Sequence, residues 1–108
     1  MVKIPDDIRK IIEDYLKELS SEIKIDKVIL FGSYAKGNHG IDSDIDLAIF
    51  SDSFKDMDRI ESIKYLLKKA RKFRGVDLQP ISFTNEDYKE RLGIVDDVLK
   101  TGIELYVN

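Results

Sequence analysis

Apolar residues recur every three or four positions in some stretches of the chain and follow one another almost without interruption in others. The first stretch has the helical spacing, with apolar residues at Ile8, Ile11, Ile12, Tyr15, Leu16 and Leu19. This spacing predicts an amphipathic helix, with Pro5 in its first turn and Asp6 and Asp7 at its positive end. The same spacing predicts a long helix over residues 56–73 and a last helix that ends at Gly102.

Short apolar runs predict strands over residues 27–31, 44–50, 76–80 and 103–107. A short helix over residues 33–36 and a loop over residues 37–43 separate the first two strands, and Thr84 is placed to cap a helix after the third. This order of elements predicts an α/β fold in which a small mixed sheet is flanked by helices. The length suits a single domain over residues 1–108.

The chemistry is concentrated between residues 28 and 50, where an apolar run ends at Gly32-Ser33 and the next run begins with Asp44-Ile45-Asp46-Leu47. Alternation along a strand puts Asp44 and Asp46 on one face. Two such carboxylates repel each other unless a cation lies between them, and oxygen ligands without His or Cys suit Mg²⁺. A Gly-Ser turn before a helix offers backbone N–H groups to phosphate. The alternative is a common turn and a common loop pattern, but the strand–turn–strand context favours a nucleotide-handling enzyme.

A third candidate carboxylate is Asp77, which alternates with Val76 and Leu78 in the predicted third strand. A carboxylate in a central strand is costly to bury unless it is paired or binds a metal. If this strand lies beside the second, Asp77 completes a triad with Asp44 and Asp46. The alternative is an aspartate at the sheet edge that is exposed to water.

The amino-acid composition excludes several kinds of binding site and argues against others. The net charge of −3 gives no general attraction to nucleic acid, and the absence of cysteine excludes disulfides and thiolate zinc sites. No stretch has the length of a membrane span and no apolar signal region begins the chain, so we expect a cytoplasmic protein. The basic residues between Lys64 and Arg74 are interpreted as a solvated helix end, with an RNA or partner contact as the alternative.

These motifs resemble those of the DNA polymerase β-like nucleotidyltransferase superfamily. Within it, Gly-Ser-Tyr-Ala-Lys-Gly followed by Asp-Ser-Asp-Ile-Asp-Leu is similar to the minimal nucleotidyltransferases, which pair with HEPN-domain proteins in prokaryotic toxin–antitoxin modules. The resemblance covers nearly the whole chain. It departs at Lys36, where many relatives carry an arginine, and lysine keeps the charge but lacks the bidentate fork that holds phosphate.

The resemblance implies a nucleotidyltransferase fold and the transfer of AMP from ATP to a hydroxyl group. Asp44, Asp46 and Asp77 would hold two Mg²⁺ ions, while Gly32, Ser33 and Lys36 would bind the triphosphate. The implied acceptor is a tyrosine of a HEPN-type toxin, which the protein would silence as its antitoxin. Two alternatives stay open: a catalytically silent antitoxin that masks its partner by binding, and transfer to a small molecule or an RNA end.

Overall fold

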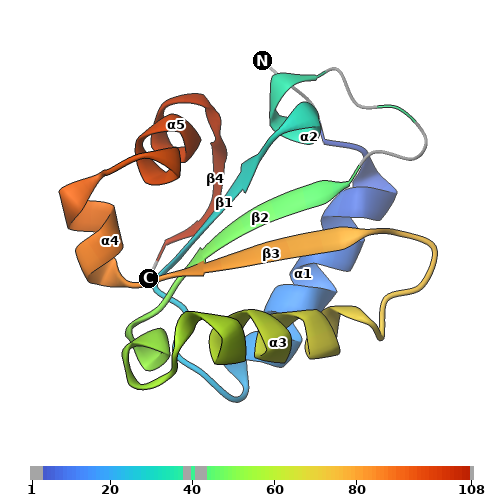
Figure 1. The fold of residues 1–108 in the computed structure, drawn as a ribbon. Coiled ribbons are helices and arrows are strands. Elements are labelled where there is room, and N and C mark those ends of the chain that lie inside the picture. The colour runs from blue at the N-terminus through green and yellow to red at the C-terminus, as the bar shows by residue number, and fades with distance from the viewer. Residues whose placement is uncertain (1–3, 38–39, 41–43, 108) are drawn as a thin grey trace.

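The computed structural model describes residues 4–37, 40 and 44–107. In chain order, the elements are α1 (Asp6–Ser20), β1 (Lys27–Phe31), α2 (Ser33–Lys36), β2 (Ile45–Phe50), the 3₁₀ helix η1 (Asp52–Asp56), α3 (Arg59–Ala70), β3 (Leu78–Phe83), α4 (Asn85–Glu90), α5 (Ile94–Thr101) and β4 (Ile103–Val107). Most of the expected loop over residues 37–43 lies outside the described residues. Figure 1 shows the four strands as one twisted sheet with helices around it.

The sheet is mixed, as the sequence predicts, with the strand order β3-β2-β1-β4. Strand β1 runs antiparallel to β2 and to β4, whereas β2 and β3 run parallel. The end of β1 therefore meets the beginnings of both β2 and β3 at one end of the sheet. Helix α2 lies at this end, in the upper part of Figure 1. The topology thus brings the Gly-Ser turn and all three candidate aspartates to the same region.

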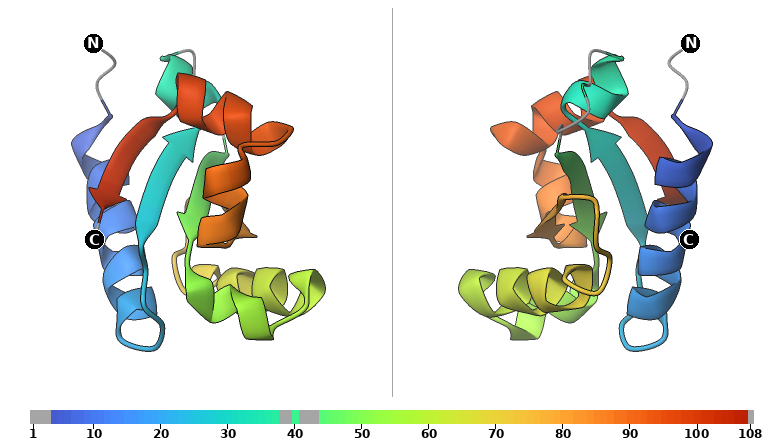
Figure 2. Two further views of the ribbon diagram at one scale, coloured as in Figure 1. Left: turned by 90° about the vertical axis from the view of Figure 1, so that its left-hand side faces the viewer. Right: turned by 90° about the vertical axis from the view of Figure 1, so that its right-hand side faces the viewer.

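Helices cover both faces of the sheet, and each face has its own apolar core (Figure 2). On one face, α1 and α3 bury Leu30 and Leu47, and the Tyr15 hydroxyl donates to the carbonyl oxygen of Leu66 at 2.8 Å. On the other face, α5 and the stacked rings of Phe50 and Phe83 form a smaller core. No helix among the described residues is both long and apolar enough to cross a membrane.

The long helix is shorter than the predicted range of residues 56–73. It begins at Arg59, because the side chain of Asp58 accepts a hydrogen bond from the backbone N–H of Glu61 at 2.8 Å and caps the helix. The residues before it form η1 instead, where the Ser51 side chain accepts from the N–H of Ser53. The predicted cap at Thr84 is confirmed, since Thr84 and Asp87 bond to each other's backbone in a capping box.

The third strand begins and ends later than predicted, covering Leu78–Phe83 rather than residues 76–80. Pro80 does not end it. The carbonyl oxygens of Asp77 and Phe83 accept from the N–H groups of Ile45 in β2 and of Ser51 directly after it. The odd-numbered backbone groups of β3 therefore face β2, and the backbone nitrogen of Pro80 faces the free edge. A proline costs no ladder hydrogen bond in that position. Asp77 therefore lies just before the strand, not inside it.

Two basic residues at and just after the C-terminal end of α3 form ion pairs with residues at and just after the end of α1. The ammonium group of Lys69 bonds to Glu22, which also accepts from the Tyr65 hydroxyl at 3.0 Å, and Lys72 bonds to Glu18. These contacts join the ends of α1 and α3 and lower the pKa of Glu22, chiefly through the hydrogen bond from Lys69. Two of the lysines that we interpreted as a solvated face are therefore partnered within the fold.

Candidate active site

The turn after β1 places backbone directly against a candidate carboxylate. Phe31 and Asp46 are paired across β1 and β2, and Gly32 follows with φ of 74° and ψ of −150°. A Cβ atom built on Gly32 would lie 2.2 Å from Oδ2 of Asp46. Both the positive φ and the close approach require glycine at this position. The Gly-Ser motif therefore lies beside Asp46, one of the expected metal ligands.

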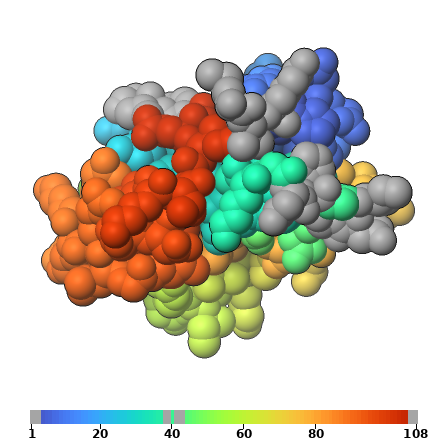
Figure 3. Space-filling model, turned by 90° about the horizontal axis from the view of Figure 1, so that it is seen from above, coloured from blue at the N-terminus to red at the C-terminus, as the bar shows by residue number. Residues whose placement is uncertain are grey.

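Helix α2 continues directly from this glycine. Ser33 is its first residue and is half-buried, while Tyr34 and Ala35 are buried and anchor the helix to the sheet. The N–H of Lys36 donates to the carbonyl oxygen of Gly32 at 3.1 Å, and the Lys36 side chain is exposed. Seen from above in Figure 3, α2 (teal) lies at the surface beside the beginning of β2 (green). Asp44 and Asp77, at the same end of the sheet, are exposed to solvent.

Asp77 lies beside Asp44, as expected if the second and third strands are neighbours. The N–H of Ile45 donates to the carbonyl oxygen of Asp77 at 2.8 Å, which aligns the two segments before the strands begin. The pKa of Asp44 is raised, first by a hydrogen bond with the Asp77 carboxyl and then by the negative charge of Asp77. Asp77 is exposed to water, as in the alternative interpretation, but it faces a second carboxylate.

Asp46 completes this group of carboxylates. The pKa of Asp46 is also raised, chiefly by burial and then by the charges of Asp44 and Asp77. Strand alternation puts Asp44 and Asp46 on the same face of β2, with Ile45 and Leu47 buried on the other. Neighbouring negative charges thus contribute to the raised pKa of Asp44 and of Asp46, as the sequence predicts for carboxylates without a cation.

The chemistry of these carboxylates fits a hard divalent cation. Three carboxylates share one end of the sheet beside a glycine cradle, and Mg²⁺ prefers such oxygen ligands. Within residues 4–37, 40 and 44–107, however, no three His, Cys, Asp or Glu side chains are arranged as a ready metal-binding group. The donor set therefore fits the ion, and the side chains would have to turn toward one another to bind it.

One polar residue of this site, Gln79, was not predicted from the sequence. Gln79 lies opposite Asp46 in the register of β2 and β3, and its Nε2 donates to Oδ1 of Asp77 at 2.7 Å. The two-residue spacing between Asp77 and Gln79 was the available signal, because strand alternation puts both on one face.

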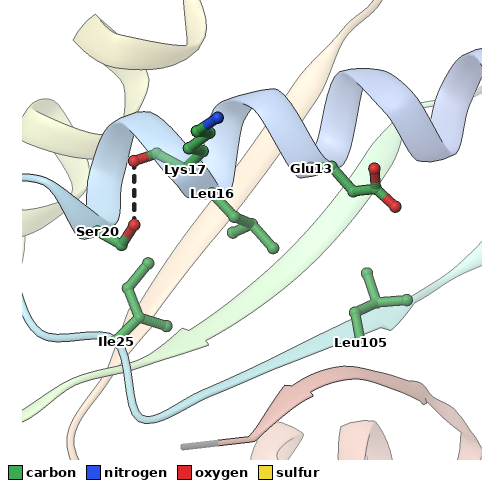
Figure 4. Close-up of a pocket in the computed structure, with 6 residues that line it drawn as sticks. All are labelled: Glu13, Leu16, Lys17, Ser20, Ile25 and Leu105. Carbon is green, nitrogen blue, oxygen red and sulfur yellow. Dashed lines mark hydrogen bonds between the residues drawn. The ribbon is translucent and has the colours of Figure 1, made fainter.

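A second surface feature lies between α1 and β4, away from the carboxylates. It is a groove of about 230 Å³ lined by Glu13, Leu16, Lys17, Ser20, Ile25 and Leu105 (Figure 4). A smaller hollow of about 60 Å³ shares Leu16 and Leu105 and continues the groove toward Ile4. The first helix and the C-terminal strand thus offer an apolar surface at one edge of the sheet.

Comparison with known proteins identifies relatives along almost the whole chain. The model of the nucleotidyltransferase domain family matches residues 9–105. Two proteins of Methanocaldococcus jannaschii, each named a putative protein adenylyltransferase, are also similar. One is 30% identical over 106 residues, covering 92% of this chain and 99% of its own. The other is 34% identical over 103 residues, covering 90% of this chain and 96% of its own.

Solved structures share the fold. A putative nucleotidyltransferase from Sulfolobus solfataricus superposes with a TM-score of 0.67 at 23% identity, over 92% of this chain and 79% of that chain. A structure described as a toxin–antitoxin with AMP-PNP superposes with a TM-score of 0.57 at 22% identity, over 92% of this chain and 73% of that chain. These similarities support the architecture that the sequence predicts.

Proposed function

This chain belongs to the nucleotidyltransferase domain family and is a nucleotidyltransferase, and from that premise we propose that it transfers AMP from ATP to a hydroxyl group of a partner protein. The observation that carries the proposal is the group of three carboxylates at the beginnings of two adjacent strands, beside the Gly32 turn. We assign Asp44, Asp46 and Asp77 as ligands of two Mg²⁺ ions. The names of the two archaeal relatives support a protein acceptor.

In the proposed reaction, an acceptor oxygen forms a bond to the α-phosphorus of ATP. The bond from that phosphorus to the bridging oxygen of the β-phosphate breaks, pyrophosphate leaves, and the hydroxyl proton passes to solvent or to a carboxylate. When bound, Mg²⁺ neutralises charge on the attacking and leaving oxygens. The chain itself positions the reactants: Asp44 and Asp46 from β2 and Asp77 from the start of β3 surround the reaction centre, and Asp77 faces the incoming hydroxyl.

The triphosphate is assigned to the turn between β1 and α2. Gly32 lets the phosphates approach the backbone, and the half-buried Ser33 hydroxyl donates to a phosphate oxygen. Lys36 is one turn further along, exposed, and supplies a positive charge without the fork of an arginine. These assignments account for a nucleoside triphosphate but contain no group that reads the base.

Replacing Ser33 with Ala is expected to weaken ATP binding without disturbing the fold. One charge-assisted hydrogen bond is worth about 1.5–3 kcal/mol, so the affinity should fall by roughly ten- to a hundredfold. Calorimetric titration with a non-hydrolysable ATP analogue measures the change. Adenosine, which lacks phosphates, should bind both proteins equally. Unchanged affinity for the ATP analogue would assign Ser33 to the turn alone.

The acceptor is proposed to be a tyrosine of a HEPN-domain partner, which this protein modifies as the antitoxin of a toxin–antitoxin module in the cytoplasm. The toxin–antitoxin structure with AMP-PNP supports this, since it combines the same fold with a nucleotide analogue. In this proposal, the partner brings its own hydroxyl group to the carboxylates.

The groove between α1 and β4 is the surface we assign to that partner. Replacing Leu16 with Glu puts a charge into its apolar part and should weaken partner binding by tenfold or more, because burying a leucine is worth about 1.5–3 kcal/mol. Replacing Ile60 with Glu is the matched control, since Ile60 is 68% exposed and lies on α3 outside the groove. Binding measured on an immobilised partner should separate the two variants, and equal binding would exclude the groove.

Titration with the ATP analogue, with and without Mg²⁺, tests the proposed site. The three repelling carboxylates should admit a triphosphate only with divalent ions present, so removal of Mg²⁺ by EDTA should reduce the affinity strongly. Equal affinity in the two conditions would contradict the assignment of Asp44, Asp46 and Asp77 as metal ligands.

A further inference from the structure

Four polar side chains occupy neighbouring positions at the start of β2 and β3. Asp44 and Asp77 lie directly before β2 and β3, and Asp46 and Gln79 lie within these strands, opposite each other in the register. Three of the four are carboxylates and the fourth is an amide. The amide donates through Nε2 to Oδ1 of Asp77 at 2.7 Å, and the Gln79 side chain is half-buried. The fourth position is therefore occupied by a neutral group that contacts the third carboxylate.

The chain segment that carries Asp77 fixes its side chain only weakly, so a hydrogen bond from Gln79 can determine where the carboxylate lies. It is exposed, it precedes the strand, and it follows Gly75, which has a φ of 87° and no atom within 4 Å of a Cβ built there. Its backbone is held by the hydrogen bond from Ile45. Among the contacts of the described residues, the bond from Gln79 holds its side chain on the face that carries Asp44.

We infer that Gln79 is a positioning residue, which holds the Asp77 carboxylate toward Asp44 so that the two can share a divalent cation. This rests on the proposed function, in which Asp77 is a metal ligand. Glutamine suits the position because it donates a hydrogen bond and adds no charge beside three carboxylates. Glutamate would accept rather than donate and would add a fourth negative charge, and an apolar residue would remove the hydrogen bond that the amide donates to Asp77.

Hydrogen-bond partners of metal ligands typically change metal affinity or activity by ten- to a hundredfold when they are replaced. Gln79→Met keeps the length of the side chain and removes the donor, so it should weaken Mn²⁺ binding by about that factor. Without metal, the unfolding temperature of Gln79→Met should remain close to that of the wild type, because we propose that Gln79 acts on the metal site and does not stabilise the fold.

The test is Mn²⁺ binding to the full chain in the presence of a non-hydrolysable ATP analogue, measured from the paramagnetic signal of the free ion. Ile81→Met is the matched control, because Ile81 lies two residues further along the same face of β3 and has no hydrogen bond to an aspartate. Asp77→Asn completes a double-mutant cycle. If Gln79 acts through Asp77, Gln79→Met should have no further effect in the Asp77→Asn background.

The outcomes separate the two proposals. Analogue binding by the wild type that needs no divalent ion would refute the metal site, and the role of Gln79 with it. Metal-dependent binding by the wild type, with Gln79→Met equal to Ile81→Met, would overturn the role of Gln79 alone. An equal loss in the wild-type and Asp77→Asn backgrounds would also overturn it, because Gln79 would then act independently of Asp77.

Discussion

Replacing Asp46 with Asn is expected to reduce AMP transfer by roughly a thousandfold. Asp46 is the carboxylate nearest the Gly32 turn, and we assign it to the metal site. A bound metal ion supplies several kcal/mol of charge stabilisation in the transition state, and each 1.4 kcal/mol corresponds to a factor of about ten in rate. Asparagine keeps the shape of the side chain but removes the charge that holds the ion. The rate of pyrophosphate release with saturating ATP and partner measures the loss.

The control for Asp46→Asn is Asp56→Asn. Asp56 is exposed at the end of η1, beyond the opposite end of β2, and its replacement removes the same charge from the chain. Its activity should equal that of the wild type. An Asp46→Asn variant that retained activity within a few-fold would contradict the assignment.

The same substitution should raise stability when metal is absent. The pKa of Asp46 is raised in the folded protein, so its ionised form lowers the free energy of unfolding at pH values above its pKa in the unfolded chain. At lower pH the side chain is protonated in both states and has no such effect. The neutral asparagine side chain of the variant would remove this destabilisation. The unfolding temperature of Asp46→Asn should therefore exceed that of the wild type at neutral pH in EDTA, and the difference should shrink in acid. An equal difference at every pH would mean that charge repulsion is not its cause.

Replacing Gly32 with Ala is expected to abolish activity for a different reason. The added Cβ would lie 2.2 Å from Oδ2 of Asp46, and the backbone has a φ of 74° that alanine adopts only under strain. Such strain costs about 1–3 kcal/mol, and the clash must displace either the turn or the carboxylate. We therefore expect a loss of transfer of at least a hundredfold, the scale associated with a displacement of about 1 Å in a reacting group.

Gly93→Ala is the control that separates the effect of backbone strain from that of the clash with Asp46. Gly93 also has a positive φ, of 56°, but a Cβ built there meets no atom within 4 Å. Both variants should unfold at lower temperature than the wild type, and only Gly32→Ala should lose transfer activity. Equal activity of the two variants would show that the contact between Gly32 and Asp46 is not needed.

The local parts of the fold and site could be predicted from the sequence. Strand β1 and helix α2 have the predicted bounds, because an apolar run and the glycines at its end are local signals. Alternation also placed Asp44 and Asp46 on one face. The position of Asp77 was only conditional, since no local pattern says which strands become neighbours. The parallel pairing of β2 and β3 confirmed that proximity, while the catalytic roles remain predictions.

The remaining differences come from contacts distant in sequence or from single side chains. Pro80 reads locally as the end of a strand, but it is accommodated because β3 is at the edge of the sheet. The bonds of Lys69 and Lys72 to α1 and the turn after it join segments far apart in the sequence, which a charge pattern within one helix cannot reveal. The contact of Gln79 with Asp77 depends on the strand start, which was predicted two residues too early.

AMP transfer to a HEPN-domain partner can be measured by mass spectrometry of that partner after incubation with this protein, ATP and Mg²⁺. We expect the intact partner to gain the mass of AMP, its peptide fragments to carry that mass on a tyrosine, and EDTA to prevent the gain. An Asp44→Asn, Asp46→Asn double variant should bind the partner without modifying it. No added mass with the wild type, together with full neutralisation of the partner by the double variant, would contradict the account and identify a protein that acts by binding alone.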